Sequence, residues 1–434
     1  MRILDSEEKD FYSFMKKFHR RGVLSFEQVE GPVRRILKEI RRRGDVALVS
    51  LTRRLDRWKA TPRNLVISQR EIQSALRSLS PMDRKTLIHA ASRIERFHLL
   101  QKQDSWLFAD DAGNLLGQIL RPLERVGIYV PGGKAAYPSS VLMNAIPAKV
   151  AGVSEIVMAC PTPQGETHPA VLAAASICGI KNIFRIGGAQ AIGAMAYGTS
   201  LIPKVDKIVG PGNVYVAAAK RLVAGEVGID SIAGPSEIVI LSDGTGDPRF
   251  LAADLLAQAE HDQRAAAVLI CTDRQFGEMV YQEIRTQLHL LPRKEIAKKS
   301  LKNFGAILVV RNMAEAVEIA NGFAPEHLEL AVSNPLKILK KIKNAGAVFL
   351  GHFSPEAIGD YVAGPNHVLP TGGAARFSSP LGVYDFLKRS SMICLSPKGF
   401  QNLSRPGMRL AEMEGLQAHR VSIAIRTSIS FGSP

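Results

Sequence analysis

The first hundred residues carry apolar positions at helical spacing. Ser25 opens a capping-box pattern, and the helix that follows should end at Gly44. Ser68 with Glu71 three residues later predicts a second helix start, and Ser80 before a proline predicts a third. This region is therefore expected to be helical.

From about residue 126 the pattern changes to short β-rich runs separated by alanine-rich helical stretches. The first series of runs is Val126–Val130, Glu155–Cys160, Asn182–Ile186 and Val205–Val209. The second series is Glu237–Leu241, Ala267–Cys271, Ala306–Val310, Glu329–Val332 and Ala347–Leu350. Strands that recur every ~25 to 30 residues with helices between them indicate βαβ units. The pattern predicts an α/β fold with two open, mainly parallel, Rossmann-like sheets.

The alternation stops after Gly382. The remaining tail has a short polar helical pattern over about residues 407–419 and a strand-like run over 422–426. This is too little to bury a core, so the tail must pack on another surface. We expect an N-terminal arm over 1–24, a first α/β domain over 25–128 and 238–381, a second over 129–237, and an extended C-terminal tail over 382–434.

The composition fits a globular protein of more than one domain, with 434 residues of which 46% are hydrophobic and 22% charged. No apolar run reaches the roughly 18 residues of a membrane span, and acidic residues stand where a signal peptide needs a basic start. We therefore expect a cytoplasmic protein. The four cysteines lie far apart, which suits buried, reduced thiols better than disulfides or a zinc knuckle.

The net charge of +16 is unusual. The first hundred residues contribute +11 of it, from 23 Lys and Arg against 12 Asp and Glu. A nucleic-acid-binding protein is therefore an alternative class, which salt-sensitive retention on DNA would favour. Against it, Arg41, Arg42 and Arg43 fall at a helix end, where cations suit the helix dipole, and the chain lacks a recognition motif.

Two segments with histidine are candidates for catalysis. Gln258 and His261 share one face of a helix end, so both can reach one metal ion, although a solvated helix end with a capping histidine fits the same residues. Glu326 stands beside His327, whose imidazole titrates near neutrality. Because neighbours in sequence usually point apart, a surface pair is the alternative there.

Other candidates lie in the glycine- and proline-rich loop 364–373 and in the tail. The loop carries His367, and Asp360 precedes it. Its length and low charge indicate an ordered, functional loop. Glu414 and His419 lie on the otherwise unexplained tail.

Three strands of the first series end in glycine turns, at residues 129–133, 187–190 and 210–213. Open α/β sheets bind ligands at the carboxyl ends of their strands, and glycine allows the backbone to approach phosphates closely. None of the three is a G-x-G-x-x-G fingerprint, so each alone also fits a plain strand–helix turn.

Together these segments resemble one family. Residues Ile229–Glu237, running on to Glu260 and His261, are similar to the signature of histidinol dehydrogenases. The segments around Glu326, over 364–373 and around Glu414 follow in the expected order and at the expected separations. The resemblance covers nearly the whole chain.

The resemblance implies a role for each candidate. One zinc ion per subunit is held by Gln258, His261, Asp360 and His419. The acid–base pair is Glu326 and His327. The substrate site is formed by these zinc ligands together with Ser236, His327, His367 and Glu414. The NAD contacts are Tyr129, Gln190 and Asn213.

The implied reaction is the NAD-dependent, four-electron oxidation of L-histidinol through L-histidinaldehyde to L-histidine, the last step of histidine biosynthesis, with zinc positioning the substrate. The family also implies a domain-swapped homodimer in which the tail completes the partner's site. The nearest alternative keeps the fold and oxidises another small polar alcohol, such as a sulfonated diol. The presence of the matched zinc ligands, His367 and Glu414 favours histidinol.

Overall fold

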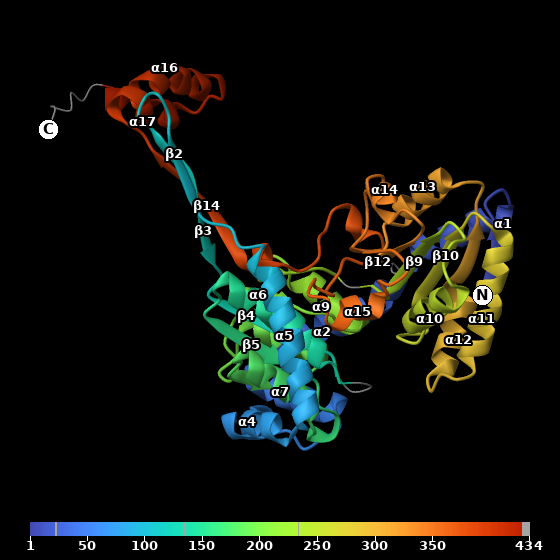
Figure 1. Ribbon diagram of the computed structural model, residues 1–434. Helices are drawn as coiled ribbons and strands as arrows, with labels where there is room; N and C mark the ends of the chain where they lie inside the picture. Colours follow the sequence, from blue (N-terminus) through green and yellow to red (C-terminus); the bar gives the residue numbers. More distant parts are fainter. Residues whose placement is uncertain (22–23, 133–135, 233, 428–434) are drawn as a thin grey trace. The chain divides into compact units, whose positions relative to one another are not determined.

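The computed structural model describes residues 1–21, 24–132, 136–232 and 234–427. The chain divides into two compact units. The first comprises Met1–Gln101 and Leu123–Phe386, and the second comprises Lys102–Pro122 and Leu387–Pro434. Both parallel sheets lie in the first unit (Figure 1), so the prediction of a mixed α/β fold with parallel sheets is confirmed. Within the described ranges, no helix has the length and apolar character needed to cross a bilayer.

A six-stranded parallel sheet has the order β1-β11-β10-β9-β12-β13. Its strands are β1 (Arg2–Asp5), β9 (Glu237–Ser242), β10 (Ala266–Cys271), β11 (Gly305–Val309), β12 (His327–Ala331) and β13 (Ala347–Leu350). One face packs on α1 (Lys9–Arg20) and α13 (Met313–Phe323), and the other on α10 (Pro248–Ala259), α11 (Arg274–Leu288) and α12 (Lys294–Phe304). Two short helices, α14 (Pro335–Leu339) and α15 (Glu356–Tyr361), flank β13 in sequence. With helices on both faces, the central strands β10 and β11 are apolar along their whole length.

A five-stranded parallel sheet has the order β6-β5-β4-β7-β8. Its strands are β4 (Arg125–Tyr129), β5 (Glu155–Ala159), β6 (Asn182–Phe184), β7 (Lys207–Val209) and β8 (Gly228–Ile229). The helices between and beside them are α6 (Pro138–Ala151), α7 (Pro169–Cys178), α8 (Gly188–Tyr197) and α9 (Val214–Val223). All nine β-rich runs read from the sequence after residue 126 correspond to strands of these two sheets.

The helices of the first hundred residues follow the predicted caps. Gly44 has φ 48° and ψ −126° and breaks α2 (Leu24–Leu55), as expected, although a second helical segment follows at once. Ser68 with Glu71 caps α4 (Gln69–Ser78), and Ser80 caps α5 (Pro81–Leu99). A short α3 (Pro62–Leu65) lies between α2 and α4. The side chain of Ser25 lies outside the described residues.

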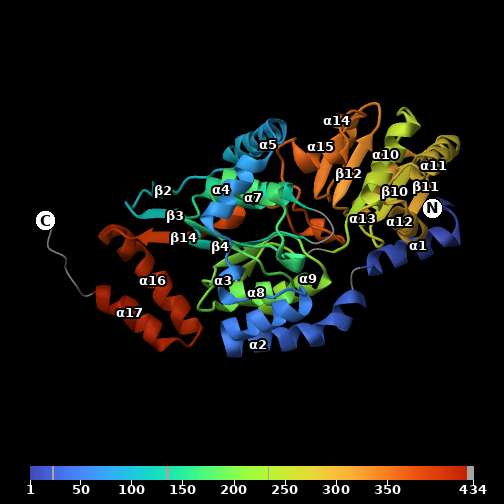
Figure 2. The ribbon, with the colours of Figure 1, turned by 90° about the horizontal axis from the view of Figure 1, so that it is seen from below.

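Helix α2 packs on α8 and α9 of the five-stranded sheet (Figure 2). Its buried stripe of Val33, Leu37 and Ile40 belongs to the same hydrophobic core as the alanine-rich face of α8. Small alanine side chains on α8 let α2 approach closely, so this helix shares a core with the five-stranded sheet.

The second unit is an antiparallel sheet with two helices. The sheet order is β14-β3-β2, formed by β14 (Leu387–Cys394), β3 (Leu115–Pro122) and β2 (Trp106–Ala109). Helices α16 (Pro397–Met413) and α17 (Gln417–Thr427) pack together. The predicted strand over 422–426 is therefore wrong, since these residues are helical. The prediction of buried cysteines is correct for Cys160, Cys178 and Cys271, but Cys394 is exposed because β14 carries no covering layer within this unit.

Candidate active site

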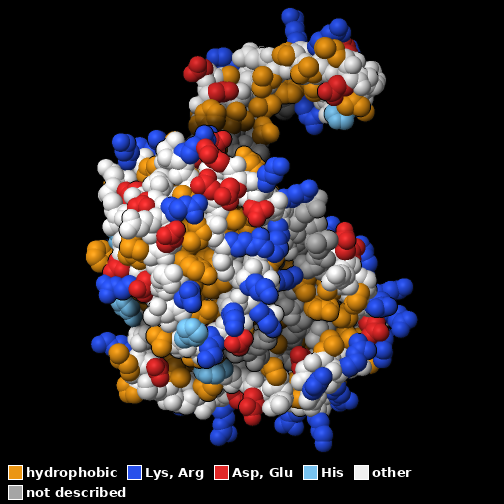
Figure 3. Space-filling model, turned by 90° about the vertical axis from the view of Figure 1, so that its right-hand side faces the viewer, with side chains coloured by type: hydrophobic (Ala, Val, Ile, Leu, Met, Phe, Trp, Pro, Cys, Tyr) orange, Lys and Arg blue, Asp and Glu red, His pale blue; other side chains and the backbone are white. Residues whose placement is uncertain are grey.

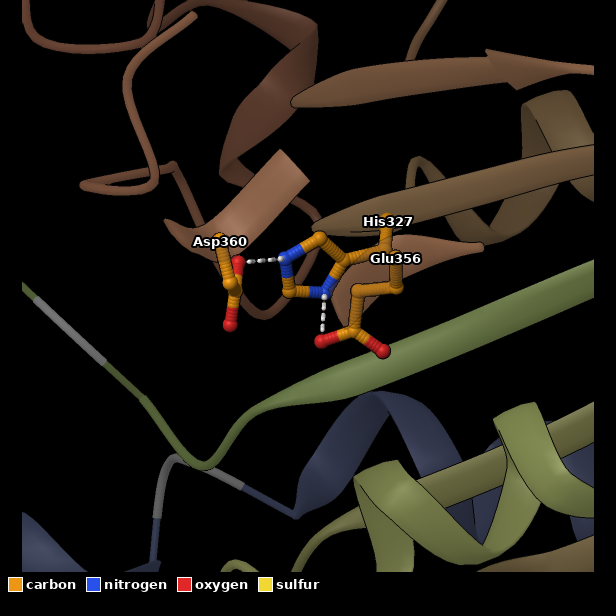
Figure 4. Close-up of side chains that lie close together, drawn as sticks. All are labelled: His327, Glu356 and Asp360. Atoms are coloured by element: carbon orange, nitrogen blue, oxygen red, sulfur yellow. Dashed lines mark ion pairs between the residues drawn. The ribbon is translucent and has the colours of Figure 1, made fainter. Parts of the chain in front are cut away.

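His327 lies in a buried cluster with two carboxylates, shown in Figure 4. His327 is the first residue of β12, and Glu356 and Asp360 are one helical turn apart on α15. One ligand atom from each of the three side chains lies within 4.8 Å of the others. Strand register places His327 opposite Ile238 of β9 and Ala347 of β13, so this cluster lies at the amino ends of the central strands.

The two ring nitrogens of His327 have different neighbours. Nδ1 lies 3.1 Å from the carbonyl oxygen of Glu237, which can only accept, so Nδ1 carries the proton and donates it there. Nε2 is buried without a hydrogen-bond partner among the described residues and lies 3.8 Å from Asp360 Oδ1. Because burial lowers the pKa of His327, its ring is neutral and Nε2 holds a lone pair. That nitrogen can accept a proton or bind a metal ion.

Glu237 holds both members of the predicted acid–base pair through its backbone. Its carbonyl accepts from His327, and its N–H donates to Glu326 Oε2 at 3.0 Å. The side chain of Glu237 is itself fixed by a buried ion pair with Arg21 and by the Gly372 N–H. Glu326 and His327, although adjacent in sequence, are thus both buried and both held by one residue, which excludes the surface-pair alternative.

The acidic side chains here carry an electrostatic cost that a cation would relieve. Burial raises the pKa of Glu326 and of Glu356 well above the usual range, and raises the pKa of Asp360 to about 7. Neighbouring carboxylates add to the shift, Glu237 acting on Glu326 and Asp360 acting on Glu356. Several buried carboxyl groups around a neutral imidazole are the mixed oxygen and nitrogen donors of a catalytic zinc site, so these residues fit a divalent cation.

Gln258 joins this cluster from the last turn of α10 and is completely buried. With its amide nitrogen donating to Glu356, the distances to the two carboxylate oxygens are 3.0 and 3.1 Å. The opposite orientation would bring the amide oxygen against two acceptors. The carboxylate therefore selects one orientation of the amide and leaves Gln258 Oε1, the better metal ligand, without that contact.

Three of the predicted substrate residues, Ser236, His261 and His367, line a cavity of about 410 Å³. Its walls also include Glu326. His367 Nδ1 donates to the backbone oxygen of Asp360 at 2.9 Å, which fixes the ring and leaves Nε2 unengaged by that bond. Asp360 and His367 also line an adjoining cavity of about 560 Å³. The predicted residues of the first unit thus fall into two groups: Gln258 and Asp360 lie with His327 and Glu356, while Ser236, His261, Glu326 and His367 line the cavity of about 410 Å³.

The three predicted NAD residues line another cavity, of about 750 Å³. Tyr129 ends β4, Gln190 lies in the first turn of α8, and Asn213 caps α9. The Tyr129 hydroxyl accepts from the Gly188 N–H at 3.1 Å. Gln190 Oε1 is buried without a hydrogen-bond partner within the described ranges. Residues from all three glycine turns therefore line this cavity, and Gly133 lies outside the described residues.

Glu414 and His419 belong to the second unit. Glu414 ends α16 and His419 lies in α17, and both side chains are exposed.

Comparison with known proteins decides the family. The family model described as histidinol dehydrogenase matches residues 19–427. The chain is 54% identical to histidinol dehydrogenase of Geobacter sulfurreducens, over 98% of this chain and 100% of the relative. It is also 54% identical to that of Syntrophotalea carbinolica, over 98% and 99%. The chain belongs to the histidinol dehydrogenase family.

A solved structure agrees with this family assignment. Histidinol dehydrogenase from Elizabethkingia anophelis superimposes with a TM-score of 0.92 at 38% identity, covering 98% of each chain. The family predicted from the sequence is confirmed, and with it an oxidoreductase.

Sequence reasoning missed two residues of this histidinol dehydrogenase site, Glu237 and Glu356. Glu237 acts through its backbone, for which its side-chain type gives no signal. Glu356 had a signal, since it precedes Asp360 by four residues and the two share one helix face. That shared face could be recognised only if α15 was predicted as a helix. Helix α15 has only six residues, between a strand and an irregular loop, so no helical pattern was evident there in the sequence.

Proposed function

We propose that this chain oxidises L-histidinol through L-histidinaldehyde to L-histidine, with NAD as electron acceptor, as the last step of histidine biosynthesis. The observation that carries the proposal is the buried Nε2 of His327, which has no hydrogen-bond partner among the described residues and lies 3.8 Å from Asp360 Oδ1. Membership of the histidinol dehydrogenase family supports the choice of substrate.

We assign zinc to Gln258, His261 and Asp360, with His419 contributed by the partner subunit. A bound cation would stabilise the charged forms of the buried carboxyl groups of Glu356 and Asp360, and this supports the assignment. When bound, zinc supplies a Lewis-acidic anchor for the polar groups of the substrate. Ser236, His367 and Glu414 contribute the remaining substrate contacts in this proposal.

The chain's own residues move the protons. His327 Nε2 accepts the hydroxyl proton as the alcohol carbon is oxidised, because Nδ1 is committed to the Glu237 carbonyl. Glu326 accepts a proton from the water that adds to the aldehyde, and its raised pKa makes it a stronger base than an exposed carboxylate. Tyr129, Gln190 and Asn213 would hold NAD, which would supply the hydride acceptor for each of the two oxidations.

A thiol-based route to the acid has no support in the buried cysteines. Burial raises the pKa of Cys160, Cys178 and Cys271 to about 12, so none provides a thiolate at neutral pH. Hydration of the aldehyde by Glu326 therefore fits the site better than a covalent thiohemiacetal.

We further propose a homodimer in which the tail of each subunit completes the other's site. Large hydrophobic side chains are exposed on the second unit, among them Trp106, Phe108, Ile393 and Met413. Figure 3 shows hydrophobic side chains on this unit. An apolar surface of this kind supports burial against another chain. Rossmann-like cofactor binding, the domain limits given above and a cytoplasmic location remain predictions from the sequence.

The deciding experiment supplies L-histidinol and NAD to the purified protein and measures NADH and product. We expect two NADH per substrate and histidine as the product. Reduction of NAD with a sulfonated diol but not with histidinol would replace the proposed substrate. Absence of both reactions in a zinc-loaded dimer would overturn the function.

A further inference from the structure

The cavity around Tyr129, Gln190 and Asn213 also takes in part of the basic N-terminal region. Arg35, Glu39 and Arg54 of α2 line it, together with Asp56 just beyond the helix end. The sequence left the role of this region open. The turns of the five-stranded sheet form one wall of the candidate nucleotide cavity, and residues of this basic region form the facing wall.

Asp56 contributes a carboxylate to the lining of this cavity. Its Oδ2 is buried and has no hydrogen-bond partner within the described ranges. Its backbone is held on both sides, because its N–H donates to Thr52 and its carbonyl accepts from Gln164 N–H at 3.4 Å. The half-buried side chain thus offers one buried acceptor atom on a fixed backbone, in a cavity that Gln190 also lines.

The backbone beside Asp56 is strained. Arg57 has φ 55°, in the left-handed region that residues with a side chain seldom adopt. Strained residues of this kind cluster at binding sites, where the surrounding structure maintains the strained conformation. The strain is retained there because it positions a functional group. Here it turns the chain directly after Asp56.

The strand order indicates which part of a dinucleotide reaches Asp56. Asn213, after β7, lines both this cavity and the one that contains Glu326, so the nicotinamide must lie at that end to reach the substrate. Gln164, which holds Asp56, follows β5, and β4 separates β5 from β7 in the sheet. Asp56 therefore lies toward the opposite end, where the adenosine half must lie.

We propose that the Asp56 carboxylate accepts hydrogen bonds from the 2′- and 3′-hydroxyls of the adenosine ribose and so selects NAD over NADP. A carboxylate suits a diol, which supplies two donors, and repels a 2′-phosphate, which supplies negative charge and no donor. This inference rests on the proposed NAD site but not on the identity of the alcohol.

The test measures equilibrium binding of NAD, 2′-deoxyadenosine NAD and NADP by calorimetry, with native protein and the Asp56→Asn variant. For native protein, loss of the 2′-hydroxyl should weaken binding by about tenfold or more, the range of a charge-assisted hydrogen bond. In Asp56→Asn that difference should largely vanish, and NADP should gain on NAD by at least a similar factor. Thermal melting verifies that the variant is folded.

Glu39→Gln is the matched control, because it removes the same charge from the same cavity. It should leave the preference for the 2′-hydroxyl intact. Equal loss of that preference in both variants, or its full retention in Asp56→Asn, would overturn the inference. If native protein binds NAD but does not oxidise histidinol, the proposed function fails while this test still decides the role of Asp56.

Discussion

At His327 and Glu326, two adjacent residues share one backbone support yet have different chemistry. His327 presents an unpartnered nitrogen, whereas Glu326 presents a carboxyl whose pKa is raised by burial. The first suits removal of a hydroxyl proton and the second suits activation of water.

Substitution should therefore separate the two oxidations. His327→Ala should slow oxidation of histidinol, and Glu326→Gln should mainly slow conversion of histidinaldehyde, each by ~10²–10⁴-fold. Single-turnover NADH formation from each substrate is the measurement, and each variant's milder step serves as its internal control. If Glu326→Gln oxidises the aldehyde at the native rate, the role of Glu326 is wrong.

Asp56 should lower the stability of the nucleotide-free protein at neutral pH. Burial raises its pKa from 3.8 to about 6, with Arg35, Glu39, Arg54 and Tyr129 also lining its cavity. Because the folded state binds this proton more tightly than the unfolded state, stability is lost as pH rises from about 4 through 6. The charged form then costs on the order of 1–2 kcal/mol, allowing for partial exposure of the side chain.

Asp56→Asn should consequently melt at a higher temperature than native protein at pH 8, with little difference at pH 4. Differential scanning calorimetry without nucleotide, at both pH values, is the measurement. A lower melting temperature for the variant at pH 8 would contradict a buried, unsatisfied carboxylate.

At the scale of elements, α15 supplies both Asp360 and Glu356, the residue that orients Gln258. Glu356→Gln keeps the shape but leaves only one oxygen to accept from the Gln258 amide. We expect zinc affinity to fall about 10- to 100-fold, as when the support of a metal ligand is removed.

Competition with a chelator, followed by elemental analysis, measures this affinity. The same chelator should abolish activity of the native enzyme, and added zinc should restore it. Glu278→Gln, an exposed carboxylate on α11, is the control and should retain native affinity. Native zinc affinity in Glu356→Gln would show that Gln258 is oriented without it.

Some secondary-structure elements could be predicted from the sequence and others could not. Strands such as β9 and β10 were predictable because both faces are buried and the apolar run is continuous. The run 422–426 has Ile423 and Ile425 two residues apart, the spacing of one face of a strand, yet it is helical. Ile423 packs close to Gly407, so contact between α16 and α17 overrides the local pattern. The sequence pattern singled out most of the candidate site residues and the family resemblance gave them their predicted roles, whereas Glu237 and Glu356 required the contacts themselves.

At the scale of the whole molecule, the proposed zinc set divides between the two units. Gln258, His261 and Asp360 belong to the first unit and His419 to the second. The exposed hydrophobic side chains of the second unit support a dimer in which these parts meet across subunits.

Mixed dimers test whether His419 serves the opposite subunit. Two inactive variants, His261→Ala and His419→Ala, are unfolded together and refolded. If the tail is exchanged, each mixed dimer has one site with both ligands and one with neither. Random pairing makes about half of the dimers mixed, so about a quarter of all sites should recover activity. If His419 instead serves its own subunit, every site in a mixed dimer lacks one ligand. No recovery in a sample shown by mass spectrometry to contain mixed dimers would therefore exclude the exchanged tail while leaving the zinc assignment intact.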